Sequence, residues 1–178
     1  MTVKTTLGVG LKRNTVELHE HAAVWEEAAR TSILELKEIL GNKAVAIEHV
    51  GSTATKDIVA KPIIDIAIGL NNLEDIVPFF EELAKKGYRH IPQNDNQWQI
   101  FFSCGDFEND IRTHHIHAVI YNSIEWCNYL KFRDTLNSDA KLREEYAALK
   151  KTLCRKYRDD REAYTEAKAD FIRKVLDS

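Results

Sequence analysis

Asp65 is the residue of this chain that most needs a chemical explanation. It stands in the run Pro62–Leu70, where its neighbours on both sides are isoleucine and alanine. A carboxylate on so apolar a strand is costly to bury unless a partner pairs with it. Strand periodicity places Ile63, Asp65 and Ala67 on one face. We interpret Asp65 as a metal-binding or catalytic residue; a structural carboxylate that pairs with an arginine or caps the backbone is the alternative.

A turn of small and hydroxylated residues, Gly51-Ser52-Thr53, follows the apolar run Ala44–Val50. Glycine allows a close approach of the backbone to a ligand, and the hydroxyls lie beside free N–H groups, which together suit a phosphate. Lys61 precedes a proline that keeps its backbone extended, and its ammonium is expected to reach the same anion. The predicted phosphate-binding residues are therefore Gly51, Ser52, Thr53 and Lys61. An ordinary turn and a solvated strand-edge lysine are the alternatives.

The third candidate group is the histidine-rich segment Arg112–His117. A strand there places His115 and His117 on one face, where two imidazoles can share a metal ion or a phosphate. His115 and His117 are thus predicted metal ligands with Asp65, and His117 is a candidate catalytic residue. Arg112 is a further predicted phosphate ligand. A hydrogen-bonded structural ring is the alternative for each histidine.

Other polar residues near these segments have weaker claims to a site. His114 is expected to face away from His115, together with Ile116. Of Glu48 and His49, which precede the glycine turn, only one can face the site if their strand is regular. A later polar group indicates a helix cap more than a site, and it consists of Asp159, Arg161, Glu162 and Tyr164.

Apolar periodicity predicts an α+β domain with a mixed sheet and a C-terminal helical layer. Strands are expected at Asn14–Leu18, Ala44–Val50, Pro62–Leu70, Gln97–Cys104 and His114–Tyr121. Helices are expected at His21–Leu40, Leu73–Lys86, Ser123–Leu136, Ala140–Tyr157 and Arg161–Leu176. We expect one domain over residues 1–178, with residues 1–122 as the α/β core and residues 123–178 as the C-terminal helices.

Composition is that of a soluble globular protein, with 44% hydrophobic and 30% charged residues. No apolar run approaches the ~20 residues that a membrane span needs, and residues 1–14 hold no long apolar segment of an export signal. The three cysteines have no CxxC spacing, which suits a reducing compartment. A cytoplasmic location without a membrane partner is therefore expected.

The charges of the C-terminal part alternate in sign. Residues 131–178 hold 13 basic and 10 acidic side chains, whereas residues 1–130 hold 12 and 18. Alternation is typical of solvated helix faces, so nucleic acid is not favoured as a partner. The tryptophans and phenylalanines are expected to fill the core or cover it.

Four segments together resemble the GrpB family. They are Ile47–Ile66 (IEHVGSTATKDIVAKPIIDI), Arg112–Val119 (RTHHIHAV), Phe132–Leu153 (FRDTLNSDAKLREEYAALKKTL) and Asp160–Ile172 (DREAYTEAKADFI). This resemblance implies a nucleotidyltransferase-like fold, similar to polymerase-β-like and antibiotic-adenylyltransferase enzymes. In that superfamily a Gly-Ser turn precedes a strand with Asp-x-Asp, and a later strand supplies a third carboxylate.

The chain departs from this implied carboxylate pattern. Gly51 and Ser52 match the turn and Asp65 matches the second aspartate, but Ile63 stands in the place of the first. His115 or His117 takes the place of the third carboxylate. Two-metal transfer needs carboxylates to hold and neutralise its cations. Either the histidines complete a single-metal site, suited to Mn²⁺ or Zn²⁺, or the transfer chemistry is lost.

Three functions remain open on this reading. The leading hypothesis is a nucleotidyltransferase-like protein that binds a nucleotide or another phosphorylated small molecule with a divalent metal (Mg²⁺, Mn²⁺ or Zn²⁺). The second is a binding module for the same ligand without turnover. The third is a metal-dependent phosphohydrolase. The sequence identifies neither the acceptor nor the oligomeric state, and fold alone does not decide between an enzyme and a binding protein.

Overall fold

The structure, a computed structural model, describes residues 8–177. Its helices are α1 (Ala23–Leu40), α2 (Phe80–Lys85), α3 (Ile124–Ser138), α4 (Ala140–Lys156), α5 (Arg161–Glu166) and α6 (Ala169–Asp177). Its strands are β1 (Leu11–Lys12), β2 (Ala44–Val50), β3 (Ile64–Leu70), β4 (Arg89–His90), β5 (Gln99–Cys104), β6 (Ile111–Arg112) and β7 (His114–Ile120).

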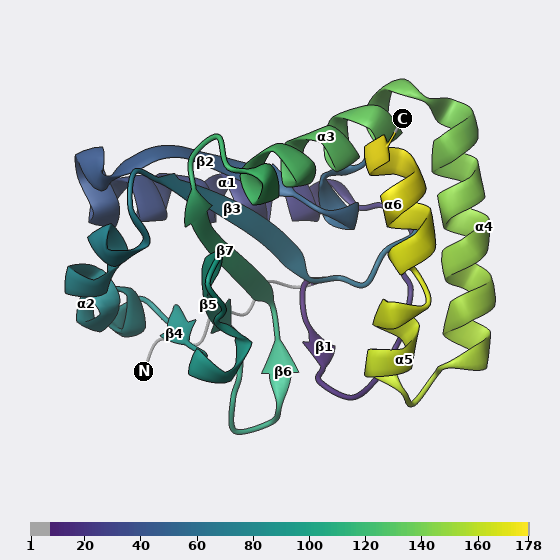
Figure 1. Cartoon of the computed structure of the whole chain (residues 1–178). Helices are drawn as coiled ribbons and strands as arrows, with labels where there is room; N and C mark the ends of the chain where they lie inside the picture. Colours follow the sequence, from purple (N-terminus) through teal and green to yellow (C-terminus); the bar gives the residue numbers. More distant parts are fainter. Residues whose placement is uncertain (1–7, 178) are drawn as a thin grey trace.

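The central sheet has the strand order β2-β3-β7-β5-β4 (Figure 1). β3 and β7 run parallel and the other neighbouring pairs are antiparallel, so the predicted mixed sheet is confirmed. β1 pairs with β6 in a separate two-stranded sheet. In the β3–β7 pairing, Asp65 lies opposite His115 and Ala67 lies opposite His117. This register brings one carboxylate and two imidazoles to one face of the sheet.

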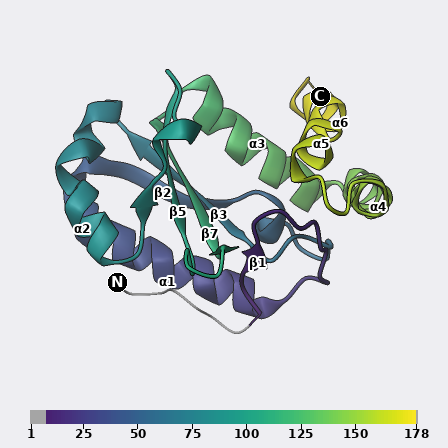
Figure 2. The ribbon, with the colours of Figure 1, turned by 90° about the horizontal axis from the view of Figure 1, so that it is seen from below.

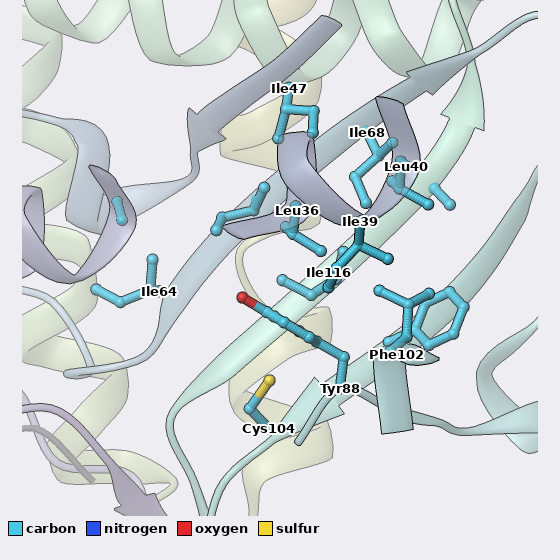
Figure 3. Packing of buried hydrophobic residues seen from close by; sticks show 14 of the residues in the cluster. Leu36, Ile39, Leu40, Ile47, Ile64, Ile68, Tyr88, Phe102, Cys104 and Ile116 are labelled. Atoms are coloured by element: carbon cyan, nitrogen blue, oxygen red, sulfur yellow. The ribbon is translucent and has the colours of Figure 1, made fainter. Parts of the chain in front are cut away.

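Helices cover both faces of the sheet (Figure 2). The isoleucine face of β3 packs on α1, and Figure 3 shows Leu36 and Ile39 of α1 among Ile64, Ile68 and Ile116 of the sheet. On the opposite face a smaller apolar cluster packs against α3, and it is formed by Val50, Ala67, Val119 and Trp126. Asp65 shares this second face, because side chains alternate along a strand.

The C-terminal helices α4, α5 and α6 stand beyond the end of the sheet at which β3 begins (Figure 1). Tyr146 of α4 packs with Ile58 and Leu136. Tyr164 of α5 packs with Val16, which precedes the sheet in the chain. Two apolar clusters thus join these helices to the rest of the domain.

The structure corrects three predicted elements. Asn14–Leu18 is not a strand, since Val16 is buried against the C-terminal helices and its N–H bonds to Arg158 O. The predicted helix Leu73–Lys86 begins as a 3-10 helix, Leu73–Phe79, which contains Pro78. Proline cannot donate the α-helical hydrogen bond, and α2 follows it. The predicted helix Arg161–Leu176 is broken into α5 and α6.

Side chains cap the N-termini of three of the C-terminal helices. The side chains of Ser123, Asp139 and Asp160 each accept a hydrogen bond from the backbone of the helix they precede. No helix among residues 8–177 is both long and apolar enough to span a bilayer. The first half of the segment considered for an export signal, residues 1–7, lies outside the described residues.

Candidate functional site

Gly51 lets the chain pass directly over Asp65. β2 ends at Val50, and Gly51 takes a φ of +72°, in the left-handed region that favours glycine. A Cβ at this position would lie 2.6 Å from Asp65 Oδ2, so a larger residue would displace the carboxylate. The predicted turn therefore lies against the aspartate of the next strand.

Asp65 is held between two imidazoles. Its Oδ1 lies 3.3 Å from His115 Nδ1 and 3.7 Å from His117 Nε2, and its side chain is 29% exposed. Burial alone would raise the pKa of Asp65, but the two imidazoles outweigh burial and hold that pKa well below its ordinary value. Asp65 is therefore an ionised carboxylate in the unliganded protein.

The partners of His117 fix the orientation of its ring. Gln99 Oε1 lies 3.1 Å from His117 Nδ1, and the Tyr129 hydroxyl lies 3.0 Å from the same atom. An amide oxygen only accepts, so with the Gln99 amide in this assigned orientation Nδ1 carries the proton of the neutral ring. His117 Nε2 lies 3.7 Å from Asp65 Oδ1, beyond hydrogen-bond distance, and a cation held between these two atoms would take its lone pair.

His115 is held in the opposite sense. Arg161 Nη2 lies 3.4 Å from His115 Nε2, and a guanidinium only donates, so Nε2 accepts. The proton of the neutral ring then lies on Nδ1, which donates to Asp65. Burial lowers the pKa of His115 and outweighs the opposing effect of Asp65. In this arrangement His115 donates a hydrogen bond where a metal ligand would present a lone pair.

Asp65 and His117 suit a divalent cation as two ligands of an incomplete set. The hydrogen bond from the far side of the His117 ring to Gln99 is usual for a metal-binding histidine. Within residues 8–177, no group of three or more His, Cys, Asp and Glu side chains is placed to hold a metal ion. The other ligands of a cation here would be water and oxygen atoms of a bound molecule, as is usual for Mg²⁺.

A cavity of about 200 Å³ opens beside Asp65, and we call it the cationic cavity. Its lining includes four cationic side chains and one acidic side chain, and these are Lys61, Lys150, Arg161, Lys168 and Asp65. Ser52, Tyr164 and Thr165 add hydroxyl groups to the lining. A group of basic side chains that a bound anion would keep protonated, together with hydrogen-bond donors, indicates a site for an anion of more than one charge.

Lys150 is the most deeply buried cation of the cationic cavity. It is 1% exposed, and its Nζ has no hydrogen-bond partner in the described part of the chain. Nζ lies 4.5 Å from the centroid of the Tyr146 ring. Burial, with repulsion from Lys168 and Lys61, holds the pKa of Lys150 well below its ordinary value. A buried amine without a hydrogen bond is costly, and an anion in the cavity would remove that cost.

Lys61 and Lys168 reach the cationic cavity over one tyrosine ring. Their Nζ atoms lie 5.3 and 4.6 Å from the centroid of Tyr164. Burial lowers the pKa of Lys61 to about 7 and the pKa of Lys168 to about 8. A bound anion would raise both pKa values again, because a nearby negative charge favours the protonated form.

Local features of the C-terminal helices place these cations. Lys150 lies on the buried stripe of α4, four residues after Tyr146 and three before Leu153. Arg161 is the first residue of α5. Lys168 occupies the break between α5 and α6. The break that the sequence does not predict thus coincides with a residue of the cavity lining.

A second cavity of about 480 Å³, which we call the apolar cavity, adjoins the first. Its lining includes six aromatic or aliphatic side chains, those of Val50, Tyr129, Phe132, Tyr146, Ile172 and Leu176. Both cavities are lined by Ser52, Asp65, Thr165 and Lys168. The two cavities therefore form one continuous site with Asp65 at their junction.

Part of the glycine turn lines this site, and part of it is buried in the protein interior. Gly51 and Ser52 line the apolar cavity, and Ser52 and Lys61 line the cationic cavity. Thr53 is 1% exposed; its Oγ1 lies 3.0 Å from His49 Nε2 and donates to Ile63 O at 3.4 Å. The structure thus brings Ser52 and Lys61 together with Asp65 and directs Thr53 away from them.

Arg112 lies apart from the cationic cavity. Its Nη2 lies 3.1 Å from Asp110 Oδ1, and its guanidinium lies 4.1 Å from the centroid of the Phe107 ring. Arg112 lines a smaller neighbouring cavity, which it shares with His115 and Arg161. The structure therefore places Arg112 and Lys61 in the linings of two different cavities.

The remaining polar candidates have structural partners. His114 lies 3.2 Å from Ser32 of α1, so it faces away from the site as expected. Glu48 shares the face of Asp65 but pairs with Arg133 at 2.8 Å. His49 faces the other way, which agrees with the expectation that only one of the two faces the site.

Sequence reasoning misses most of the cationic cavity. The alternating charges predict solvated faces, whereas Lys150 is buried and Lys168 lines the cavity. Arg161 and Tyr164, interpreted as part of a helix cap, also line it. One signal was available: Lys150 interrupts an apolar stripe at helical spacing, where a lysine is unusual without a partner.

Comparison with known proteins shows the family. The family model described as GrpB protein matches residues 15–178. The chain belongs to the GrpB family. The glutamate-rich protein GrpB of Alkalihalophilus pseudofirmus is 36% identical over 171 residues, which cover 94% of this chain and 98% of that protein. The crystal structure of conserved protein GrpB from Enterococcus faecalis has a TM-score of 0.82 at 26% identity, covering 90% of this chain and 95% of that chain.

A more distant similarity confirms the fold that the resemblance implies. The structure of Cid1 in complex with its short product ApU has a TM-score of 0.53 at 13% identity, covering 76% of this chain and 42% of that one. The chain thus has a nucleotidyltransferase-like fold.

Proposed function

We propose that this protein binds a nucleotide, with the phosphate groups in the cationic cavity and the nucleoside in the apolar cavity. The observation that carries the proposal is Lys150 Nζ, which is buried and has no hydrogen-bond partner in the described residues. A group of this kind is expected where a ligand supplies the missing acceptor. Four cationic side chains in one lining suit a di- or triphosphate.

The apolar cavity suits the nucleoside. Its volume of about 480 Å³ is in the range of small-molecule sites. Tyr129, Phe132 and Tyr146 offer aromatic surface, on which a base stacks with a gain of roughly 1–3 kcal/mol. Ser52 and Asp65 line both cavities. In a nucleotide that fills both cavities, the bond between sugar and phosphate would therefore lie beside Asp65.

We further propose nucleotidyl transfer to an acceptor hydroxyl as the reaction. Asp65 and His117 would hold a divalent cation (Mg²⁺, Mn²⁺ or Zn²⁺), which supplies charge neutralisation at the reacting phosphate. Lys61, Lys150 and Lys168 would hold the phosphates that leave. In the metal-free site His117 Nε2 presents a lone pair and suits a general base for the acceptor hydroxyl. One nitrogen cannot serve as metal ligand and base together, so the metal dependence of turnover distinguishes these roles.

A second candidate function is nucleotide binding without turnover. Ile63 is 5% exposed and lines the cationic cavity two residues before Asp65, in the place of the first aspartate that the resemblance implies. A side chain of hydrocarbon cannot bind a second cation. This observation favours a protein that holds the ligand and leaves its phosphate bonds intact.

Isothermal titration with ADP, ATP, CTP, GTP and UTP tests the binding proposal, each with and without Mg²⁺, Mn²⁺ or Zn²⁺. Lys150→Met should weaken binding of the preferred nucleotide by at least about tenfold, since a charge-assisted hydrogen bond contributes roughly 1.5–3 kcal/mol. Lys151→Met changes the exposed neighbour on α4 and is the matched control. Failure of every nucleotide to bind, or equal affinity in the two variants, contradicts the proposal.

Product analysis then separates the candidate functions. Release of pyrophosphate that depends on an acceptor, and is lost in Asp65→Asn, supports transfer. Tight binding of a nucleotide that stays intact with every acceptor offered supports the binding module. Release of free phosphate with water as acceptor would instead indicate the phosphohydrolase.

A further inference from the structure

A third cavity, of about 60 Å³, adjoins the cationic cavity, and we call it the arginine cavity. Three arginine residues take part in its lining, Arg13, Arg112 and Arg161. Ser103, Asn94 and Gln93 add polar groups. One water molecule needs roughly 10–15 Å³ of such space, so this small cavity has room for a few water molecules or one small charged group.

The guanidinium of Arg112 is held in place before any ligand binds. Its side chain is 12% exposed, and it bonds to Ile111 O and pairs with Asp110, each at 3.1 Å. The Phe107 ring adds to this fixation, because the Arg112 guanidinium lies 4.1 Å from its centroid. A guanidinium has five N–H donors, so these two contacts leave donors for a ligand.

Arg161 joins the arginine cavity to the cationic cavity, since it lines both. Its hydrogen bonds to Arg13 O and to His115 Nε2 are both 3.4 Å long. The usual N–H···O distance is about 2.9–3.0 Å, so both bonds are weak. A phosphate oxygen in either cavity would be a stronger acceptor for the same guanidinium.

We propose that the arginine cavity is a second anion subsite, which binds a phosphate monoester group next to the nucleotide. The proposal rests on the proposed function and adds to it the chemistry of a second group. Arg13, Arg112 and Arg161 bring three positive charges to the cavity, and Asp110 balances one of them from outside its lining. Arginine forks match the oxygen atoms of phosphate in pairs, which lysine does not do.

The phosphate can come from two sources, and the position of the subsite allows both. His115 lines the arginine cavity and contacts Asp65, where the reacting phosphate would lie. The subsite can therefore hold the terminal phosphate of the same nucleotide. It can equally hold a phosphate carried by the acceptor, which would position the acceptor beside Asp65.

Inorganic phosphate is the first probe, added at constant ionic strength while the free energy of unfolding is measured in urea. Each site stabilises by RT ln(1 + [L]/Kd), so at saturation two sites give twice the stabilisation per tenfold rise in phosphate that one site gives. We expect the two-site slope for wild type and for the surface control Arg30→Met. Arg112→Met and Lys150→Met should each retain one site.

Arg13→Met is a second test of the subsite in case Arg112→Met does not fold, because Arg13 is exposed and lies in the same lining. The inference is overturned if Arg112→Met and Arg13→Met keep the wild-type slope. It is also overturned if wild type shows one site that Lys150→Met removes. Loss of one phosphate site in Lys150→Met tests the proposed function separately. Failure of the arginine subsite and failure of the proposed function are therefore distinguishable.

Tripolyphosphate identifies the source of the phosphate. If the subsite binds the terminal phosphate of the same ligand, Arg112→Met weakens the binding of tripolyphosphate by about tenfold but leaves the affinity for pyrophosphate unchanged. If it takes an acceptor's phosphate, inorganic phosphate still stabilises protein saturated with tripolyphosphate, and Arg112→Met abolishes that increment. If Arg112→Met behaves as Arg30→Met in both titrations, no second subsite exists.

Discussion

Replacing Lys150 by methionine should make the unliganded protein more stable and its ligand complex weaker. Lys150 is 1% exposed, and its Nζ lacks a hydrogen-bond partner in the described residues. Burying such a group without a partner costs roughly 1–3 kcal/mol in proteins. Methionine keeps a similar length and has no polar atom that needs an acceptor, so Lys150→Met should recover most of that cost.

The expected gain is about 1–3 kcal/mol in the free energy of unfolding, which is about 2–12 °C in midpoint at roughly 2–4 °C per kcal/mol for a chain of this size. The ligand reverses the order of the two proteins. At about 100 times its dissociation constant, a ligand stabilises wild type by roughly 2.7 kcal/mol. The variant should lose most of this increment, because it lacks the deepest cation of the cationic cavity.

Urea unfolding of wild type, Lys150→Met and Lys151→Met, with and without tripolyphosphate, measures both effects at once. The control changes an exposed residue and should stay within about 0.5 kcal/mol of wild type. A Lys150→Met protein that is less stable than wild type without ligand would show that Nζ stabilises the fold. A variant that keeps the full ligand increment would show that Lys150 does not contact the anion. Either result refutes the reasoning from its burial.

Three further predictions concern the same site. Lys61 and Lys168 have pKa values lowered to about 7 and about 8, so above those values the folded protein binds fewer protons than the unfolded chain. The free energy of unfolding of the unliganded protein should therefore rise from about pH 6 to 10. Urea unfolding of the double variant Lys61→Met/Lys168→Met should show a smaller rise across that range. Phosphate affinity should fall over the same range, as these cations lose their protons. Gly51→Ala should destabilise by roughly 1–3 kcal/mol, because it adds a positive φ strain and a contact with Asp65, and a urea midpoint equal to wild type would contradict this. Asp65→Asn should abolish the part of nucleotide stabilisation that needs a divalent cation and keep the part that does not, as measured by thermal unfolding with and without chelator.

The strands that carry the candidate site were predictable because the signal of each strand is local. Side chains alternate along a strand, so one segment suffices to place His115 and His117 on the same face. The strand Ala44–Val50 is found with the bounds that the sequence predicts. The pairing of β3 with β7 depends on residues 50 positions apart, and only the structure shows that Asp65 lies opposite His115.

The cationic cavity was not predictable to the same degree, because it depends on how separate helices pack. In a helix with alternating charges, each lysine has a similar local sequence, and tertiary contacts decide that Lys150 is buried while Lys151 is exposed. The strand expected at Asn14–Leu18 fails for a related reason. Val16 buries its apolar side chain against Tyr164 and not within a sheet.

The cationic cavity also accounts for the missing carboxylates. Two divalent ions on three carboxylates, as the superfamily pattern implies, leave about one net positive charge at the phosphates. Here four cationic side chains face one acid, so the side chains alone supply more positive charge than that when all are protonated. A site of this kind does not need Ile63 to be an aspartate in order to hold an oligophosphate. On the proposed function, most of the charge that binds the ligand would come from the C-terminal helical layer, which carries three of the four cations, and Asp65 with His117 would be left to a single cation or to the proton of an acceptor.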